Sequence, residues 1–201
     1  MVDLSQNFTL ESMVKSETAT KMMLGREQFS PSSGIITNLK NLCVFVLQVV
    51  RDKSGSPINC SSGFRCPALN SEIGGSYLSD HLLGNAADIY IKYKYSETEN
   101  FKKFRSYITG RIQNMCSVKV DLSKTSPNFI LMCFLALNMK EMKIHQLIHE
   151  NGDFGSPRWI HVSRHENNAR NEIQLIKKGS PTIKKADIND FIQKIEWVFS
   201  I

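Results

Sequence analysis

The sequence predicts an α+β fold, in which helices flank a small and mostly antiparallel sheet. Two kinds of apolar spacing lead to this prediction. Apolar side chains recur at intervals of three and four over 36–50, the period of an amphipathic helix. Residues 86–91, 146–150 and 159–163 are short apolar or alternating runs, which are typical of strands. At 201 residues the chain suits one domain, and we expect residues 1–201 to form it.

The expected elements follow in order along the chain. Thr9 can cap a short helix, with Glu11 in its first turn. The long helix over 36–50 should end at Lys53-Ser54-Gly55, where glycine permits a left-handed residue. The later elements are a strand over 57–62, a short helix over 67–73, a strand over 86–91, a helix over 96–115, a helix or strand over 129–139, paired strands over 146–150 and 159–163, a strand over 172–178 and a C-terminal helix around 186–200.

Composition narrows the class of partners. The chain is 41% hydrophobic and 22% charged, and its longest apolar stretch, 129–139, is too short for a membrane span, so we expect none. A net charge of +6 favours anionic partners. Basic clusters over 92–105 and 177–185 accompany no recognisable nucleic-acid motif, and we expect no nucleic-acid partner. The five cysteines form no Cys-x-x-Cys pair, which excludes a recognisable zinc–thiolate motif.

Two histidines and one aspartate form the principal candidate for chemistry. His81 and Asp88 are too far apart for one helical turn, but they can converge if the chain turns at Gly84 into the strand that carries Asp88. His161 lies in an alternating strand pattern. Two imidazoles and one carboxylate can bind a catalytic Zn²⁺ and leave a fourth position for water. Taken singly, each residue could instead be a surface, turn or core residue.

The surrounding residues carry a resemblance to a known family. Ser79-Asp80-His81-Leu82-Leu83-Gly84-Asn85-Ala86-Ala87-Asp88, followed by Trp159-Ile160-His161-Val162-Ser163, resembles the zinc D-Ala-D-Ala carboxypeptidase and L-alanyl-D-glutamate endopeptidase family of peptidoglycan peptidases. The similarity extends to 7–11, 41–52, 58–76 and 146–150. It implies the hedgehog/DD-peptidase-like fold and Zn²⁺ held by His81, Asp88 and His161. Compared with compact relatives, residues 116–143 look like an insertion.

The general base is not given by the resemblance. Many relatives carry an acidic residue three positions before the last histidine ligand, where this chain has Arg158. Either the base is lost, or another carboxylate replaces it. Pairing of Glu150 with Trp159 would put Glu150 on the same strand face as His161, whereas a one-residue shift would bring His149 there. Glu150 is our candidate, and Asp153 in the following turn is the fallback.

Three further residues are candidates for substrate contacts. The resemblance implies that Arg65 binds or polarises the substrate near the cleaved bond, and its planar fork suits a carboxylate. A structural salt bridge, for example to Glu72, is the alternative. Ser76 and Ser79 could donate hydrogen bonds to substrate, or they could only cap local turns.

The resemblance therefore implies a zinc metallopeptidase that hydrolyses peptidoglycan stem or cross-bridge peptides, as a D-Ala-D-Ala carboxypeptidase or an endolysin-like endopeptidase. The alternative is a catalytically impaired zinc-binding module of the same fold that binds the cell wall, with Arg158 as its warning sign. Asp3 and polar residues 5–7 stand where a signal peptide needs a basic start and an apolar core. We expect synthesis in the cytoplasm and action on the cell wall only after release. The oligomeric state is not predicted.

Overall fold

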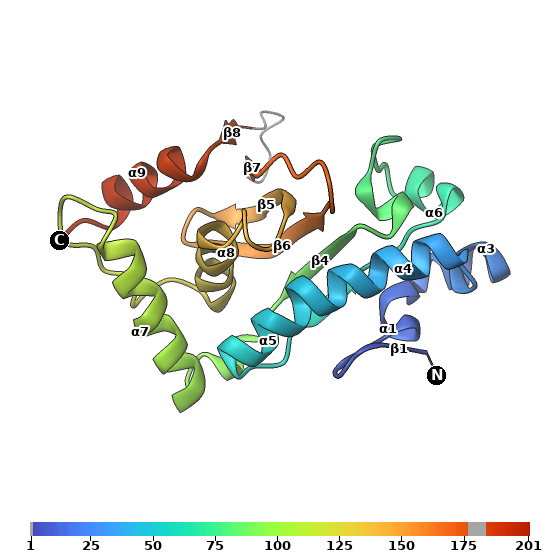
Figure 1. Ribbon diagram of the computed structural model, residues 1–201, viewed down its shortest axis with the longest axis horizontal. Coiled ribbons are helices and arrows are strands. Elements are labelled where there is room, and N and C mark those ends of the chain that lie inside the picture. Colours follow the sequence, from blue (N-terminus) through green and yellow to red (C-terminus); the bar gives the residue numbers. More distant parts are fainter. Residues whose placement is uncertain (1, 177–183) are drawn as a thin grey trace.

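The structure of the protein is a computed structural model that describes residues 2–176 and 184–201. Its centre is a six-stranded sheet in the order β3-β4-β6-β5-β7-β8 (Figure 1). Only the β5–β7 pair within it is parallel, so the predicted α+β class with a mostly antiparallel sheet is confirmed. The strands are β3 (Asn59–Ser62), β4 (Ala86–Tyr90), β5 (Ile144–Asp153), β6 (Ser156–Arg164), β7 (Glu172–Ile176) and β8 (Lys184–Ala186).

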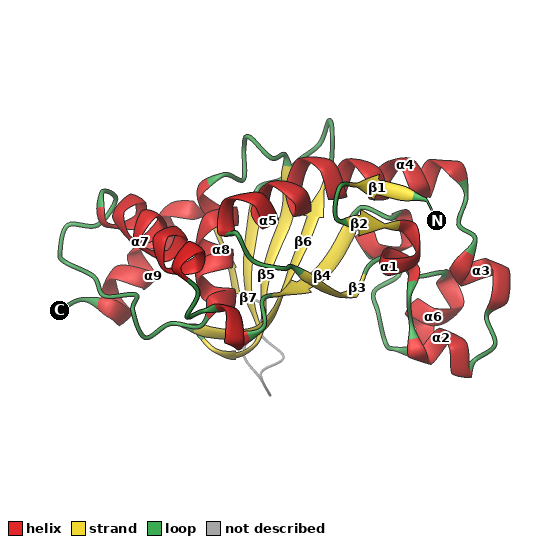
Figure 2. Cartoon of the chain, turned by 90° about the horizontal axis from the view of Figure 1, so that it is seen from below, coloured by secondary structure: helices red, strands yellow, loops and turns green. Residues whose placement is uncertain are grey.

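One long helix crosses over the strands (Figure 2). It consists of α4 (Ser33–Leu42), a π-helical turn η1 (Cys43–Leu47) and α5 (Gln48–Ser54), and it ends at Gly55 with φ of 60°, as the sequence predicted. Gly25–Ser54 is long and apolar enough to cross a membrane by length and composition, a test that core helices also pass. Its fully buried stripe belongs to the hydrophobic core: Leu39, Leu42, Cys43, Val46, Leu47 and Val50.

Helix α8 (Pro127–Leu137) packs against β4, β5 and β6 on the same side of the sheet. From the sequence, residues 129–139 could form either a helix or a strand, and the structure shows a helix here. Nearly every side chain of α8 is buried, and a helix that is apolar all round gives no amphipathic period by which it could be recognised. Helices α7 (Glu99–Gln113) and α9 (Ile188–Phe199) lie near α8 at the C-terminal end of the molecule (Figure 2).

The opposite end of the molecule carries the N-terminal elements (Figures 1 and 2). Thr9 caps α1 by accepting a hydrogen bond from Ser12 N, as expected. These elements are β1 (Asp3–Ser5), β2 (Phe8–Thr9), α1 (Leu10–Val14), α2 (Glu17–Lys21), α3 (Gly25–Phe29) and α6 (Pro67–Glu72), and two 3₁₀ turns, η2 (Asp80–Leu83) and η3 (Tyr93–Tyr95), flank β4. Residues 177–178 of the strand predicted over 172–178, and most of the basic cluster over 177–185, lie outside the described residues.

Strand alternation separates the two faces of the sheet. Ala87, Ile89, Ile160 and Val162 are fully buried and belong to the core beneath the helices. The residues between them point the other way, and this second face carries the candidate site. Across it, Asp88 pairs with His161, Ile148 with His161, and Glu150 with Trp159.

Candidate active site

His81, Asp88 and His161 come together through one turn and two paired strands. Asp88 on β4 and His161 on β6 are directly opposite each other in the antiparallel register. The η2 turn brings His81 to them: Ser79 caps it, and Gly84 ends it with φ of 71°. A Cβ at Gly84 would lie 2.8 Å from Ile35 O, so both the backbone conformation and the packing require glycine. The turn at Gly84 expected from the sequence is thus confirmed.

The three side chains are buried and their polar atoms meet. Only 2% of His81, 8% of Asp88 and 7% of His161 is exposed. His161 Nδ1 lies 3.1 Å from His81 Nε2 and 3.1 Å from Asp88 Oδ1, and His81 Nε2 lies 3.3 Å from the same carboxylate oxygen. His81 Nδ1 lies 2.6 Å from Gly63 O. Because a carbonyl can only accept, Nδ1 carries the hydrogen, and the lone pair of Nε2 faces the other two residues.

This arrangement fits a zinc ion. Ligand atoms about 2.0–2.2 Å from a tetrahedral zinc lie about 3.3–3.6 Å from one another, close to the separations found here. The three distances between His81 Nε2, Asp88 Oδ1 and His161 Nδ1 are 3.1, 3.1 and 3.3 Å. Two imidazole nitrogens and one carboxylate oxygen of these residues lie close enough together to hold a metal ion. The Gly63 carbonyl orients His81 as outer partners of metal-bound histidines do.

The electrostatics of the cluster favour the protonation states that bind metal. Burial lowers the pKa of His81, which keeps its imidazole neutral. Burial by itself would raise the pKa of Asp88, but the polar contacts with His161 and His81 outweigh it and hold that pKa well below its usual range. A neutral imidazole and an ionised carboxylate are the forms that donate electron pairs to a cation.

Arg65 contacts the second oxygen of the Asp88 carboxylate. Its Nη2 forms an ion pair with Asp88 Oδ2, and its Nε donates to Ser62 Oγ at 2.7 Å. Arg65 N also donates to His81 O at 3.1 Å, which ties the segment after β3 to the η2 turn. The alternative partner considered from sequence was Glu72, so the pairing with Asp88 is a finding that sequence reasoning missed. Arg65 both orients Asp88 and lines the cleft above it.

The cluster lies in an open cleft of about 1000 Å³. Glu150 lines this cleft and pairs with Trp159, which is one of the two registers that the sequence left open. Burial, and next the charge of Asp88, raise the pKa of Glu150. The neighbouring His149 belongs to the other strand face, where its Nε2 donates to Asp153 O at 3.0 Å. The register therefore brings Glu150, and not His149, to the metal-facing side.

Asp153 and Arg158 lie elsewhere. Asp153 is exposed at the end of the β5–β6 hairpin, pairs with Ser156, and is not among the residues that line the cleft. Arg158 lines a separate cavity with Tyr90 and Tyr93, because it alternates away from His161 on β6. The arginine at the position where relatives carry an acid therefore does not enter the cleft.

The cleft walls combine polar and apolar side chains. Ser76 and Ser79 both line it, and both also serve local turns: Ser76 Oγ accepts from Leu78 N at 3.1 Å, and Ser79 Oγ from His81 N at 3.4 Å. Leu78 and Leu83 are 76% and 53% exposed on its rim. These two leucines add apolar surface to the rim of the cleft. This rim could not be recognised from the sequence, because neither leucine belongs to a periodic pattern.

An α+β domain with two imidazoles and one carboxylate gathered in a cleft has the architecture of a zinc hydrolase. Comparison with protein-family models matches residues 6–116 to Peptidase M15, the family of zinc D-Ala-D-Ala carboxypeptidase-like peptidoglycan peptidases. The match covers more than half of the chain, and the protein belongs to the Peptidase M15 family. A search of curated proteins found no match.

Family membership confirms the resemblance seen in the sequence and implies the hedgehog/DD-peptidase-like fold. The family is zinc-dependent, which agrees with the fit of the His–Asp–His cluster to zinc. The matched segment contains Arg65, His81 and Asp88 but ends before His161. His161 joins the set through the β4–β6 register alone. The expected insertion over 116–143 lies beyond the match and stays a prediction.

Proposed function

We propose that the protein is a zinc metallopeptidase that hydrolyses peptide bonds in peptidoglycan stem or cross-bridge peptides. The observation that carries the proposal is the spacing of His81 Nε2, Asp88 Oδ1 and His161 Nδ1, which matches the edges of a tetrahedral zinc site inside an open cleft. When bound, zinc would supply a Lewis acid that lowers the pKa of water and polarises the scissile carbonyl.

In this proposal Glu150 takes the proton from the attacking water and passes it to the leaving amine. Its raised pKa supports the role, because a carboxyl group whose pKa lies closer to neutrality is a better proton carrier in both directions. Its position on the same strand face as His161 supports it as well. Asp153 lacks this support, since it lies at the exposed end of the hairpin.

Arg65 has two tasks in the proposal. Its Nη2 fixes the carboxylate of Asp88, while the remaining hydrogens of its planar fork can bind a substrate oxygen in the cleft. Ser76 and Ser79 would offer further hydrogen bonds to the peptide. The rim leucines Leu78 and Leu83 suit the methyl groups of alanine-containing stem peptides.

The net charge of +6 supports an anionic polymer as substrate, because peptidoglycan carries free carboxylates. We propose that the enzyme acts on the cell wall after release from the cytoplasm. The alternative, a module that binds zinc without catalysis, rested on Arg158, and that side chain lies outside the cleft. Glu150 lines the cleft and supplies a carboxylate in place of the acid that position 158 lacks, which favours the catalytic function.

Mass analysis of peptidoglycan fragments tests the proposal. Purified peptidoglycan is incubated with zinc-loaded protein, and the products are compared with those from a zinc-loaded Glu150→Gln variant. Loss of a terminal D-alanine would define a carboxypeptidase, and separated stem or bridge peptides an endopeptidase. Unchanged fragment masses with folded, zinc-loaded protein on several peptidoglycan types would refute the peptidase proposal and leave the binding module.

A further inference from the structure

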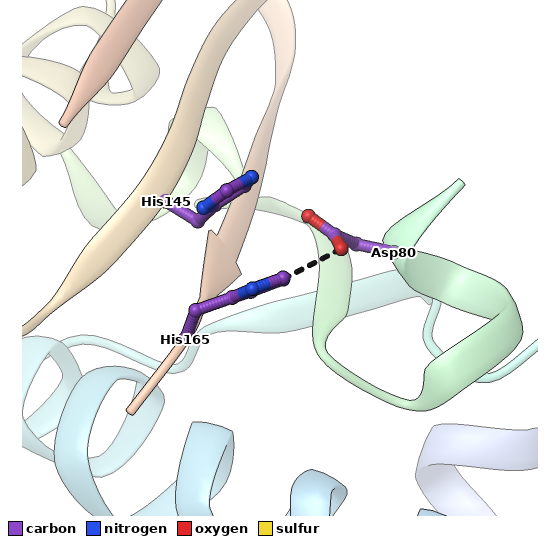
Figure 3. A group of neighbouring side chains, drawn as sticks. All are labelled: Asp80, His145 and His165. Carbon is purple, nitrogen blue, oxygen red and sulfur yellow. Dashed lines mark hydrogen bonds and ion pairs between the residues drawn. The ribbon is translucent and has the colours of Figure 1, made fainter. Parts of the chain in front are cut away.

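A second group of metal-binding side chains lies along the same cleft. Asp80, His145 and His165 approach one another from the η2 turn, β5 and the end of β6 (Figure 3). One donor atom from each lies within 4.8 Å of the others. His165 Nε2 is 2.7 Å from Asp80 Oδ1, and the two imidazole rings are stacked with centroids 3.8 Å apart. None of the three residues is needed for the His81–Asp88–His161 cluster.

A β-bulge creates this second group. Ile144 pairs with Arg164 and Gln146 pairs with Ser163, so His145 is the extra residue between them on β5. A bulge turns its side chain away from the regular alternation. His165 N donates to Lys143 O at 3.1 Å, which holds the residue after β6 beside this bulge. The irregular strand end therefore brings His145 and His165 to the same side.

The hydrogen bonds around the group direct its lone pairs inward. His145 Nδ1 donates to Asn168 O at 2.8 Å, so Nε2 is the ring atom with a lone pair. Outer hydrogen bonds of this kind are typical of histidines that bind metals.

The Asp80 carboxylate has an unused oxygen. Asp80 is only 7% exposed, and its Oδ2 is buried with no hydrogen-bond partner among the described residues. Burial opposes ionisation of Asp80, but hydrogen bonding with Ser163 and His165 lowers its pKa, and the Ser163 hydroxyl also accepts a hydrogen bond from Gln146 N at 3.2 Å. An ion pair between Asp80 and His165 would use Oδ1 alone. Buried carboxylate oxygens are rarely left without a partner, and a cation would satisfy this one.

We propose that Asp80, His145 and His165 form a second zinc site. Two imidazole nitrogens and a carboxylate oxygen suit zinc better than magnesium or calcium, which prefer all-oxygen ligands. Because Asp80 directly precedes His81, an ion at this site would link the turn that carries His81 to the ends of β5 and β6. The site is therefore a positioning element beside the first metal centre.

The second site can be tested independently of the proposed peptidase function by measuring zinc binding to a variant in which the His81–Asp88–His161 cluster is disrupted. The double variant His81→Ala/His161→Ala keeps one ligand of that centre. Titration with Zn²⁺ alone, followed by calorimetry and elemental analysis after desalting, should find about one zinc per folded chain. Adding His145→Ala or His165→Ala should weaken this binding at least tenfold, because even outer-shell changes cost that much. Glu166→Gln, which removes an exposed carboxylate next to His165, is the matched control and should bind zinc unchanged.

The proposal is overturned if the folded double variant binds no zinc, or if its zinc survives both histidine substitutions. If circular dichroism shows that the double variant does not fold, the comparison moves to the wild-type protein and His145→Ala/His165→Ala. A stoichiometry lower by one zinc in the variant supports the second site. An equal stoichiometry overturns it.

Discussion

Replacement of Glu150 by glutamine separates proton transfer from metal binding. The change keeps the size of the side chain and its place opposite Trp159, but it removes the group that accepts the proton. We expect turnover on peptidoglycan to fall about 100-fold or more, the usual effect of losing a positioned general base. That loss corresponds to about 2.7 kcal/mol of transition-state stabilisation.

The structure also predicts what Glu150→Gln leaves unchanged. Burial raises the pKa of Glu150, which means that the folded protein disfavours its charged form. A neutral amide should therefore not lower the melting temperature. Zinc content should also remain, because the three proposed ligands are His81, Asp88 and His161.

The assay is steady-state release of new amino groups from purified peptidoglycan, with zinc content and melting temperature measured on the same samples. Asp153→Asn is the matched control, since that carboxylate is exposed at the hairpin end. Near-normal turnover in Glu150→Gln would refute the reasoning from the β5–β6 register. A 100-fold loss in Asp153→Asn would transfer the role of the base to the hairpin.

Three further predictions follow from the same geometry. Arg65→Lys should lower turnover more than it raises the Michaelis constant, because lysine cannot hold Asp88 and a substrate oxygen at once; equal kinetics in Arg65→Lys and Arg65→Ala close to wild type would contradict this. Gly84→Ala should lower the free energy of unfolding, measured in denaturant, by about 1–3 kcal/mol, because φ is 71° and the new Cβ would meet Ile35 O. Gly110→Ala is the control and should not destabilise the protein, because the space around its Cβ is open. Burial lowers the pKa of His81 below its value in the unfolded chain, so the unfolded chain takes up the extra proton first as the pH falls. The free energy of unfolding of the metal-free protein should therefore be constant above about pH 6.5 and decrease below it. His81→Gln should make this decrease with falling pH smaller.

Local patterns in the sequence were sufficient for much of the fold. The alternation around His161 and Glu150 predicted two strands but left two registers open, with either Glu150 or His149 on the face of His161, and the structure has Glu150 there. Gly84 predicted the turn into β4, because few residues other than glycine tolerate its left-handed backbone conformation. Helix α8 could not be distinguished from a strand, because burial on all sides removes the periodic signal.

The features that the sequence did not predict depend on contacts between distant residues. The pairing of Arg65 with Asp88 requires the β3–β4 register, which contains an irregularity between Cys60 and Ser62. The bulge at His145 turns this side chain out of the regular strand alternation, and no pattern of residue types predicts the bulge. Regular periodicity therefore predicts the layers, and the motif around Gly84 with the family resemblance predicts the candidate metal site of His81, Asp88 and His161, whereas irregular strand positions supply the additional polar contacts around it.

The most direct test of the central claim is anomalous diffraction at the zinc absorption edge from crystals of the zinc-loaded protein. We expect an anomalous peak about 2.0–2.2 Å from His81 Nε2, Asp88 Oδ1 and His161 Nδ1, within the cleft that Glu150 lines. Crystals of His161→Ala prepared in the same way should lose that peak. Absence of zinc density among these three residues in the fully loaded wild-type protein would contradict the account.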